Sequence, residues 1–450
     1  MSASLRDCLR RFVPSWHYLA QRGLVRNTGW MTIGFALTAA FQAGYFVIVA
    51  RALGASGFGA FAAGLALVSI VAPFSGLGAR NLVVMRTARD QTLFSEYFGT
   101  GIIAVLFTGG ALAAGTLAIG YAVFHGSEVA AVLPWVAASE LGAAQITDLV
   151  MHCFQAHERV RAGALVLTAS SGVRVAAAIL FVSTEARPTA SHWATWYFGA
   201  SATVAVVVLA IGTIQLGRPR LGWSAATTIL RHGIFYSIGS ASQTVYADID
   251  KTMLARLDST TVAGVYTGAY RLVGMMSTPF LAFVYAANPR FFREGERDAP
   301  LVWQLAQRAR KFAVVYGAVV AAVCLIAAPA LPWILGDSFK ESSQVVRWLA
   351  LLPLIQAIHI IYGNALMGVG RQALRSAVQV GTAGLNAGLN LWLIPLYSWR
   401  GAAAATLFGE GLLAVAMVVL LHRATHPRSP AHHEEVSLRA ERSPAKASPQ

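Results

Sequence analysis

Apolar runs long enough to cross a bilayer recur twelve times along this sequence. A helix needs about 20 apolar residues to cross the hydrocarbon core of a membrane. Only 12% of the residues are charged, against about 25% in a soluble domain. We therefore predict an all-α polytopic membrane protein of about 12 transmembrane helices. The predicted spans are 28–50, 58–80, 97–124, 130–152, 163–183, 193–214, 233–257, 262–286, 312–333, 345–368, 376–397 and 401–421.

The lysines and arginines are divided unevenly between the two sides of this predicted bundle. If the N-terminus is placed inside, the inner segments hold 26 of the 35 basic residues, whereas the outer loops and helix mouths hold five. Because basic residues gather on the cytoplasmic side of membrane proteins, both termini are predicted to be cytoplasmic. The same distribution explains the net charge of +15 without a nucleic-acid partner.

An internal repeat at an offset of 205 residues suggests two related halves. IGFA at 33–36 matches IGSA at 238–241, and Gly59 matches Gly264. Six spans in each half, entered from the same side, predict parallel repeats around a cavity, although glycine-rich apolar helices also resemble one another by chance. The predicted parts are a cytoplasmic N-terminal segment (1–27), an N-terminal six-helix bundle (28–214), a cytoplasmic linker (215–232), a C-terminal six-helix bundle (233–421) and a disordered cytoplasmic tail (422–450).

Three connecting features are also expected from the local sequence. The second span contains Pro73 and is expected to be kinked there. Residues 80–90 are expected to form a basic inner loop. Residues 288–312 alternate apolar and basic side chains, which predicts either an interfacial amphipathic segment or a solvated linker.

Formal charges inside the predicted spans mark the candidate functional residues. Each costs about 2.5–3.5 kcal/mol at the middle of a membrane helix on insertion scales. Asp248 and Lys251 are three residues apart and share a helix face, so they can pair. Asp250 points to a different face. We expect this stretch to provide either the electrostatics of an outer cavity or gate, or a structural ion pair.

Two membrane-embedded carboxylates are candidates for ion coupling. Asp148 forms a polar stripe with Gln145 and His152 in the fourth span, and Glu410 lies in the middle of the twelfth. Desolvation favours the protonated form of such a carboxylate, so either group can bind and release a coupling proton. The alternative is a neutral, hydrogen-bonded packing residue. Amide side chains in the spans either bind sugar hydroxyls or tie helices together: Gln243, Gln356, Asn364, Asn386 and Asn390.

No enzyme motif is recognisable in the sequence. It contains no P-loop lysine motif and no HExxH pattern, and its three cysteines lie far apart. We therefore expect a non-enzymatic protein without catalytic residues, cofactor or metal. The predicted outer loops are short, which argues against a membrane-bound glycan polymerase or ligase.

Several motifs, in their order and spacing, resemble those of a known family. They are ARALGASGFGAFA (50–62), FQAHERVRAGAL (154–165) and DIDKTMLARLDSTTVAGVYTGAYRLV (248–273). Over about residues 25–421 the chain resembles the oligosaccharide (O-antigen and polysaccharide) flippases. These belong to the superfamily that also includes the multidrug and toxic-compound extrusion transporters.

This resemblance implies two six-helix bundles around a V-shaped cavity and outward transport of undecaprenyl-diphosphate-linked glycans for cell-surface polysaccharide biosynthesis. It also implies the cytoplasmic (inner) membrane of a bacterium, with membrane lipids, a polysaccharide polymerase and glycosyltransferases as partners. A diphosphate needs cations, which Arg174, Lys251 and Arg271 can supply, with Asp248 and Asp250 beside them. The alternative for each cation is an internal ion pair or a side chain that reaches the membrane interface.

The sequence leaves two further alternatives for the function of the chain. An ion-coupled drug or cation antiporter of the same superfamily would have a cavity rich in acids and aromatics with few cations, which the three embedded cations disfavour. A membrane scaffold that transports nothing would tolerate substitution of every charge in its cavity.

Overall fold

The computed structural model describes residues 22–295 and 299–426. Throughout these residues the regular structure is helical, which confirms the predicted fold class. Most of the predicted tail and most of the predicted N-terminal segment lie outside the described residues. The first four tail residues, 422–425, are helical and continue the last described helix, Trp399–Thr425.

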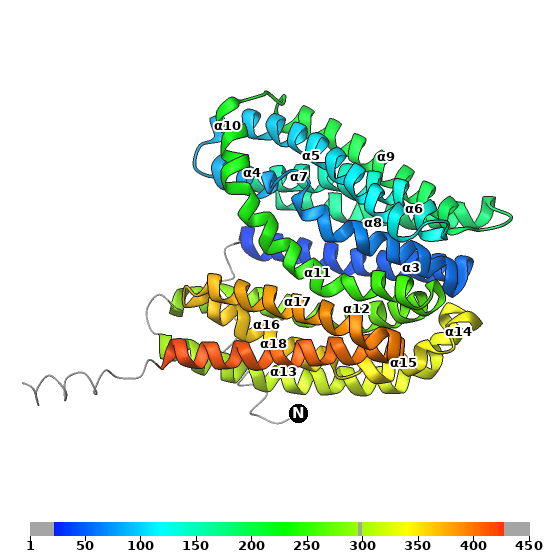
Figure 1. Ribbon diagram of the computed structural model, residues 1–450. Coiled ribbons are helices and arrows are strands. Elements are labelled where there is room, and N and C mark those ends of the chain that lie inside the picture. The colour runs from blue at the N-terminus through cyan, green and yellow to red at the C-terminus, as the bar shows by residue number, and fades with distance from the viewer. Residues whose placement is uncertain (1–21, 296–298, 427–450) are drawn as a thin grey trace, which may run out of the picture.

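The first group of helices lies in the upper part of Figure 1. Its members are α3 (Arg22–Val71), α4 (Ala79–Thr87), α5 (Phe94–Val123), α6 (Glu128–Ala137), α7 (Ala144–Ala156), α8 (Val160–Thr184) and α9 (Ala190–Leu216). A π-helical turn, Ala138–Ala143, joins α6 to α7.

The second group lies below it in the same view. Its members are α12 (Thr260–Gly295), α13 (Ala299–Ala327), α14 (Leu331–Leu335), α15 (Ser342–Leu349), α16 (Leu352–Gly368), α17 (Gln372–Tyr397) and α18 (Trp399–Thr425). Between the groups come α10 (Trp223–Thr228), a π-helical turn (Ile229–Gly233) and α11 (Ile234–Leu257), which runs diagonally from one group to the other (Figure 1).

The described helices account for the twelve predicted spans. Eight stretches are long and apolar enough to cross a membrane, and one of them, Leu37–Thr87, covers the first two predicted spans. The remaining three predicted spans correspond to α11, α12 and α17, which are not among these eight apolar stretches. Two of these, α11 and α12, carry Asp248, Lys251 and Arg271 and therefore have a polar composition for membrane helices.

The breaks between the first helices follow from glycine and proline. Within α3, Gly54 adopts φ 65° and ψ −179°, a conformation that favours glycine, and this residue separates the first two predicted spans. The expected kink at Pro73 is a full break, because α3 ends at Val71 and the chain turns before α4 begins. The prediction of a loop over 80–90 was wrong for most of that segment, since α4 continues to Thr87.

The segment 288–312 also differs from its prediction. Helix α12 continues to Gly295 and α13 begins at Ala299, so most of this stretch extends two long helices. Its alternation of apolar and basic residues reflects the buried and exposed faces of those helices: Val302 and Leu305 are buried, whereas Arg310 and Lys311 are exposed.

The two halves approach each other closely at a pair of glycines related by the 205-residue offset. A Cβ atom on Gly59 would lie 1.8 Å from the carbonyl oxygen of Thr260, and one on Gly264 would lie 1.9 Å from that of Ala55. Only glycine permits this approach of backbones. Beside it, Ser56 Oγ and Thr260 Oγ1 lie 3.0 Å apart. This contact closes the end of the molecule that carries α14, here called the α14 end; the opposite end is called the α4 end.

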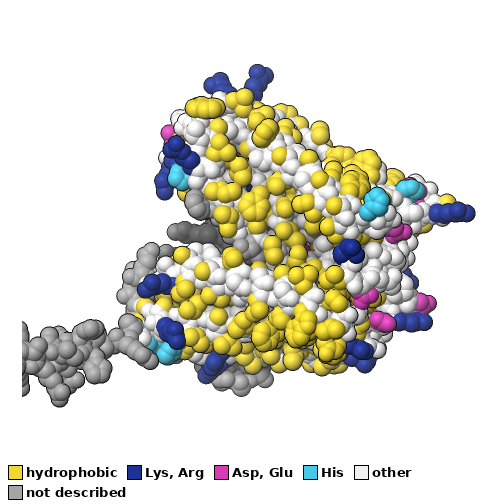
Figure 2. Space-filling model, viewed as in Figure 1, with side chains coloured by type: hydrophobic (Ala, Val, Ile, Leu, Met, Phe, Trp, Pro, Cys, Tyr) yellow, Lys and Arg dark blue, Asp and Glu magenta, His cyan; other side chains and the backbone are white. Residues whose placement is uncertain are grey.

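An apolar belt surrounds both halves. Figure 2 shows hydrophobic side chains spread over the flank of the molecule, with most charged side chains at its two ends. Many large apolar side chains on the outside are exposed, such as Phe107 at 78% and Ile214 at 83%. A surface of this kind suits contact with lipid acyl chains. Polar groups between the halves are costly in such a surrounding and are therefore candidates for function.

Candidate substrate-binding cavity

A polar cavity lies between the two halves, and helices of both contribute to its wall. Its central compartment has a volume of about 460 Å³ and includes Arg174, Lys251 and Arg271 in its lining. A second compartment of about 520 Å³ shares Ser69 and Asp248 with it. A third compartment, of about 160 Å³, shares Gln42 and Arg174 with the central one. The structure thus brings together four of the five residues predicted for the cavity, namely Arg174, Asp248, Lys251 and Arg271.

Arg174 reaches the central compartment from α8 and lies against an aromatic ring. Its Cζ is 4.9 Å from the ring centre of Tyr197 on α9, close enough for a cation–π contact. The Tyr197 hydroxyl donates a 2.7 Å hydrogen bond to Glu140 Oε1, which comes from the π-helical turn before α7. Tyr197 therefore separates the guanidinium from the nearest carboxylate.

Arg271 enters from α12 on the opposite side. Its Nη1 donates a 3.0 Å hydrogen bond to the hydroxyl of Tyr45 on α3, and its Cζ lies 5.7 and 5.6 Å from the ring centres of Phe46 and Phe58. Both guanidiniums line the central compartment together with Tyr45 and Tyr197. We call Arg174, Arg271, Tyr45 and Tyr197 the arginine cluster.

Neither arginine of this cluster forms an ion pair within the described part of the chain. No carboxylate oxygen described there lies within 4.0 Å of either guanidinium. A guanidinium has five N–H donors, and only one of those on Arg271 is used by Tyr45. Most of the donors in the arginine cluster are therefore available to an anionic ligand.

The three charges on α11 are arranged differently. Lys251 Nζ lies 3.0 Å from Asp248 Oδ1 and 3.4 Å from Asp250 Oδ1, and it also donates to the carbonyl of Ala247. Its ammonium lies 4.1 Å from the ring centre of Tyr270. We call Asp248, Asp250 and Lys251 the lysine triad. The predicted pairing of Asp248 with Lys251 is present.

Asp250 does not line the cavity compartments. The side chain of Asp250 is 2% exposed, whereas the side chain of Asp248 is 31% exposed. This agrees with the helical geometry, which directs the two aspartates to different faces of α11. In this structure the carboxylate of Asp250 is connected to the cavity through Lys251, 3.4 Å away, and a direct role in the cavity stays a prediction.

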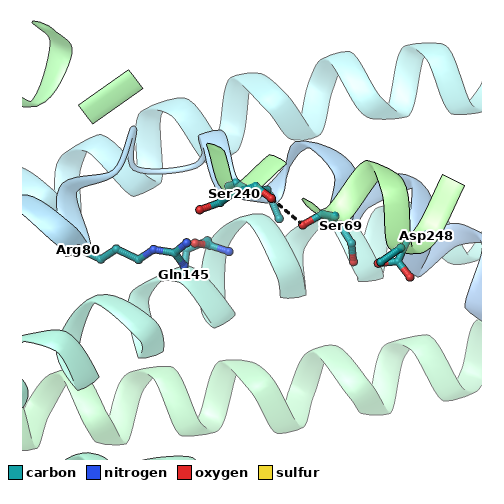
Figure 3. Close-up of a pocket in the computed structure, with 9 residues that line it drawn as sticks. Ser69, Arg80, Gln145, Ser240 and Asp248 are labelled. Carbon is teal, nitrogen blue, oxygen red and sulfur yellow. Dashed lines mark hydrogen bonds between the residues drawn. The ribbon is translucent and has the colours of Figure 1, made fainter. Parts of the chain in front are cut away.

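Asp148 is held by an arginine that the sequence placed in a loop. Arg80 Nη1 donates a 2.6 Å hydrogen bond to Asp148 Oδ2, and His152 Nδ1 lies 3.4 Å from Asp148 Oδ1. Arg80 lines the second compartment and Asp148 lines the third. In Figure 3, Arg80 and Gln145 lie together at one end of the second compartment and Asp248 lies at the other.

Glu410 is buried inside the C-terminal half rather than in the cavity. It is 1% exposed. Gln356 Nε2 donates a 2.8 Å hydrogen bond to its Oε1, and His359 Nδ1 lies 2.7 Å from its Oε2. The amides Asn386 and Asn390 are also buried in this half, and Asn390 donates to Asn386. These two amides tie α17 together within the core and do not line the three compartments.

The sequence analysis missed the aromatic members of the site and Arg80. Tyr45, Tyr197 and Tyr270 each contact a cation in the cavity. A signal was present, since each tyrosine lies in a predicted span, but tyrosines carry neither the formal charge nor the amide group that marked the candidate residues. Arg80 was counted with the inner loops, because the helix break at Pro73 that brings it to the cavity was expected only as a kink.

This fold is shared with solved membrane transporters of the MOP superfamily. The structure matches an inward-facing multidrug resistance MATE family transporter of that superfamily with a TM-score of 0.69 and 16% identity, covering 90% of this chain and 96% of the other. The match to an outward-facing multidrug resistance MATE family transporter has a TM-score of 0.57 and 15% sequence identity, and it covers 93% of this chain and 96% of the other. A third match is a MOP superfamily transporter from Pyrococcus furiosus, which is described as having a binding pocket of reverse polarity. Its TM-score is 0.58 and its sequence identity 16%, and the match covers 90% of this chain and 96% of the other.

The chain belongs to the polysaccharide biosynthesis protein family, whose model matches residues 24–294. Among curated proteins, none matches it by sequence. The family and the fold agree with the resemblance found in the sequence motifs.

Proposed function

We propose that this protein is a flippase that moves a lipid-linked oligosaccharide from the inner to the outer leaflet by alternating access. Its substrate carries a diphosphate between the lipid and the glycan; undecaprenyl is the lipid implied by the sequence resemblance. The observation that carries this proposal is the arginine cluster: two guanidiniums face a cavity between the halves without a carboxylate within 4.0 Å in the described residues.

The chemistry of the cluster fits a diphosphate. Arginine binds phosphate oxygens with two parallel N–H donors, and such charge-assisted bonds are stronger than neutral ones. Arg174 and Arg271 come from opposite halves, so a ligand held by both would link the two halves. A change in their separation during rocking would then alter its affinity, as alternating access requires.

We further propose that the α4 end faces the cytoplasm of a bacterial cell, that the membrane is the inner one and that both termini are cytoplasmic. The positive-inside distribution supports this orientation. The close Gly59–Gly264 contact at the α14 end would then close the outer side, and the higher TM-score with an inward-facing transporter fits that state. A polysaccharide polymerase and glycosyltransferases are proposed as partners, and no enzymatic step is proposed for this chain.

For ion coupling, Glu410 is the stronger of the two proposed carboxylates. Its partners are a histidine and an amide, and the histidine can exchange a proton with it. Asp148 is already paired with Arg80 at 2.6 Å, so its carboxylate has a permanent cationic partner within the protein.

An ion-coupled drug or cation antiporter is the second candidate. Glu140 favours it, because this carboxylate lines the central compartment and its described hydrogen-bond partner is the hydroxyl of Tyr197. An organic cation would bind Glu140 and be repelled by Arg174. A lipid diphosphate would show the reverse pattern.

Transport by the purified full chain in proteoliposomes separates the two candidates. We expect flipping of a polyprenyl-diphosphate trisaccharide, and we expect Arg174→Ala and Arg271→Ala to abolish it while Glu140→Gln retains it. Arg187→Ala, at an exposed arginine in the loop between α8 and α9, is the matched control. Transport of a cationic dye that depends on Glu140, with no flipping of the lipid, would contradict the proposal.

A further inference from the structure

The second compartment of the cavity has an uncharged wall apart from two charged residues. We define the glycan compartment by its polar lining: Ser69, Arg80, Gln145, Ser240, Thr244 and Asp248. Four of these six are hydroxyl or amide side chains. It adjoins the arginine cluster, because Ser69 and Asp248 line both compartments. A ligand with its diphosphate on the arginines can therefore extend directly into it.

Each charged residue of the glycan compartment already has an opposite charge at hydrogen-bond distance. Arg80 donates to Asp148 at 2.6 Å, and Asp248 lies 3.0 Å from Lys251. A ligand carboxylate that recruited Arg80 would have to replace Asp148, and truncating or displacing one member of a partly buried pair leaves the other uncompensated. The compartment thus offers no cation to a second anionic group.

Hydroxyl and amide side chains are suited to sugars instead. Each hydroxyl both donates and accepts, as do the amides, so they match the hydroxyl and acetamido groups of a neutral glycan. An ionised carboxylate placed there would exchange part of its water for neutral side chains without gaining a partner charge, and such an exchange is unfavourable. The two parts of the cavity therefore have different preferences: anionic at the arginine cluster and neutral in the glycan compartment.

Building on the proposed function, we infer that the glycan carried by this protein is uncharged at the positions next to its diphosphate, and that the Arg80–Asp148 ion pair enforces this selection. Acidic sugars are rejected because their carboxylate finds Arg80 already neutralised.

Equilibrium binding tests the inference with two probes. Both are short-chain polyprenyl-diphosphate trisaccharides, and they differ only in whether a sugar near the diphosphate carries a CH2OH group or a carboxylate. Binding to the purified full chain is measured by competition at fixed salt. We expect the neutral probe to bind at least about tenfold more tightly, the fold-change that corresponds to 1.4 kcal/mol. Equal binding, or tighter binding of the acidic probe, would overturn the inference.

Variants locate the cause of the selection. Asp148→Asn leaves Arg80 without its carboxylate partner, so the preference for the neutral probe should shrink or reverse. Asp337→Asn is the control, because it removes an exposed carboxylate 3.7 Å from Lys340 and should leave the ratio of affinities unchanged. If Asp148→Asn does not fold, Gln145→Lys adds a positive charge to the same wall and should shift the ratio in the same direction.

An unchanged ratio in both the Asp148→Asn and Gln145→Lys variants would refute the role of the ion pair. Failure of wild-type protein to bind either lipid would be a different result, since it would overturn the proposed flippase function itself.

Discussion

The arginine cluster and the lysine triad line the same compartment, yet they present their charges in opposite ways. Arg174 and Arg271 contact tyrosine and phenylalanine side chains, with no described carboxylate within 4.0 Å. Lys251, by contrast, lies within 3.4 Å of two carboxylates. The sequence predicted a partner for Lys251, namely Asp248, but none for either arginine. Under the proposed function, the cations that bind the ligand are those whose neighbours leave them uncompensated.

Aromatic neighbours explain how the arginines remain available. A ring face attracts a cation by about 0.5–2 kcal/mol without neutralising it. A carboxylate at 3 Å cancels most of the charge and occupies the donors. The tyrosines therefore contact the guanidiniums without neutralising them and leave most of their N–H groups available to the phosphate oxygens of the proposed substrate, whereas Asp248 and Asp250 pair with Lys251 on α11.

The largest difference between the two regions is expected in stability. Lys251→Gln leaves Asp250, which is 2% exposed, as a buried carboxylate without a cation and should cost about 3–5 kcal/mol in the free energy of unfolding. Arg174→Ala removes a cation–π contact and should cost about 0.5–2 kcal/mol. Chemical denaturation of the purified variants measures both.

The double variant Lys251→Gln/Asp250→Asn serves as the control, because it removes both charges and should recover most of the lost stability. If Lys251→Gln proves no less stable than Arg174→Ala, the lysine triad is not the structural element described above.

A smaller effect should distinguish the two aspartates of the triad. Asp250→Asn removes the buried partner of Lys251 and should cost about 1–3 kcal/mol, the usual range for a buried group that loses its partner. Asp248 is 31% exposed on its side chain, so solvent screens its ion pair and Asp248→Asn should cost less than about 1 kcal/mol. Thermal unfolding in one detergent compares them, and equal losses would argue against this division.

An effect on transport rather than on stability is expected at Glu410, which lies outside both regions. If it is the coupling residue, a gradient of one pH unit contributes about 1.4 kcal/mol per proton, so the gradient should stimulate wild-type flipping up to about tenfold. Glu410→Gln should remove this stimulation, whereas Arg187→Ala should keep it. If flipping by Glu410→Gln still responds to the pH gradient, Glu410 is not the coupling residue, and Asp148 becomes the remaining candidate.

Features with a strong local signature were predictable from the sequence. Twelve apolar runs predicted the all-helical membrane fold, and the spacing of Asp248 and Lys251 predicted their ion pair. The matching of Gly59 with Gly264 depended on a repeat that sequence statistics alone support weakly. Their contact, backbone to backbone across the two halves, gives a physical reason for glycine at both positions.

The rest depended on contacts between distant segments. No spacing rule connects Arg174 to Tyr197 or Arg271 to Tyr45, which lies 226 residues away. The Arg80–Asp148 pair required the chain to break at Pro73 and resume as a helix, so that an arginine counted as part of a loop reached the cavity. Burial also separated Glu410 from the cavity charges, and hydropathy cannot distinguish a core position from a cavity wall.

Binding of a short-chain polyprenyl diphosphate without any glycan tests the central claim most directly. Each charge-assisted hydrogen bond to phosphate contributes about 1.5–3 kcal/mol, or roughly 10- to 100-fold in affinity. The account predicts that Arg174→Ala/Arg271→Ala weakens this binding at least about 100-fold, while Arg187→Ala binds like the wild type. Binding by the double variant that stays close to the wild-type affinity would contradict the claim that the arginine cluster holds the diphosphate.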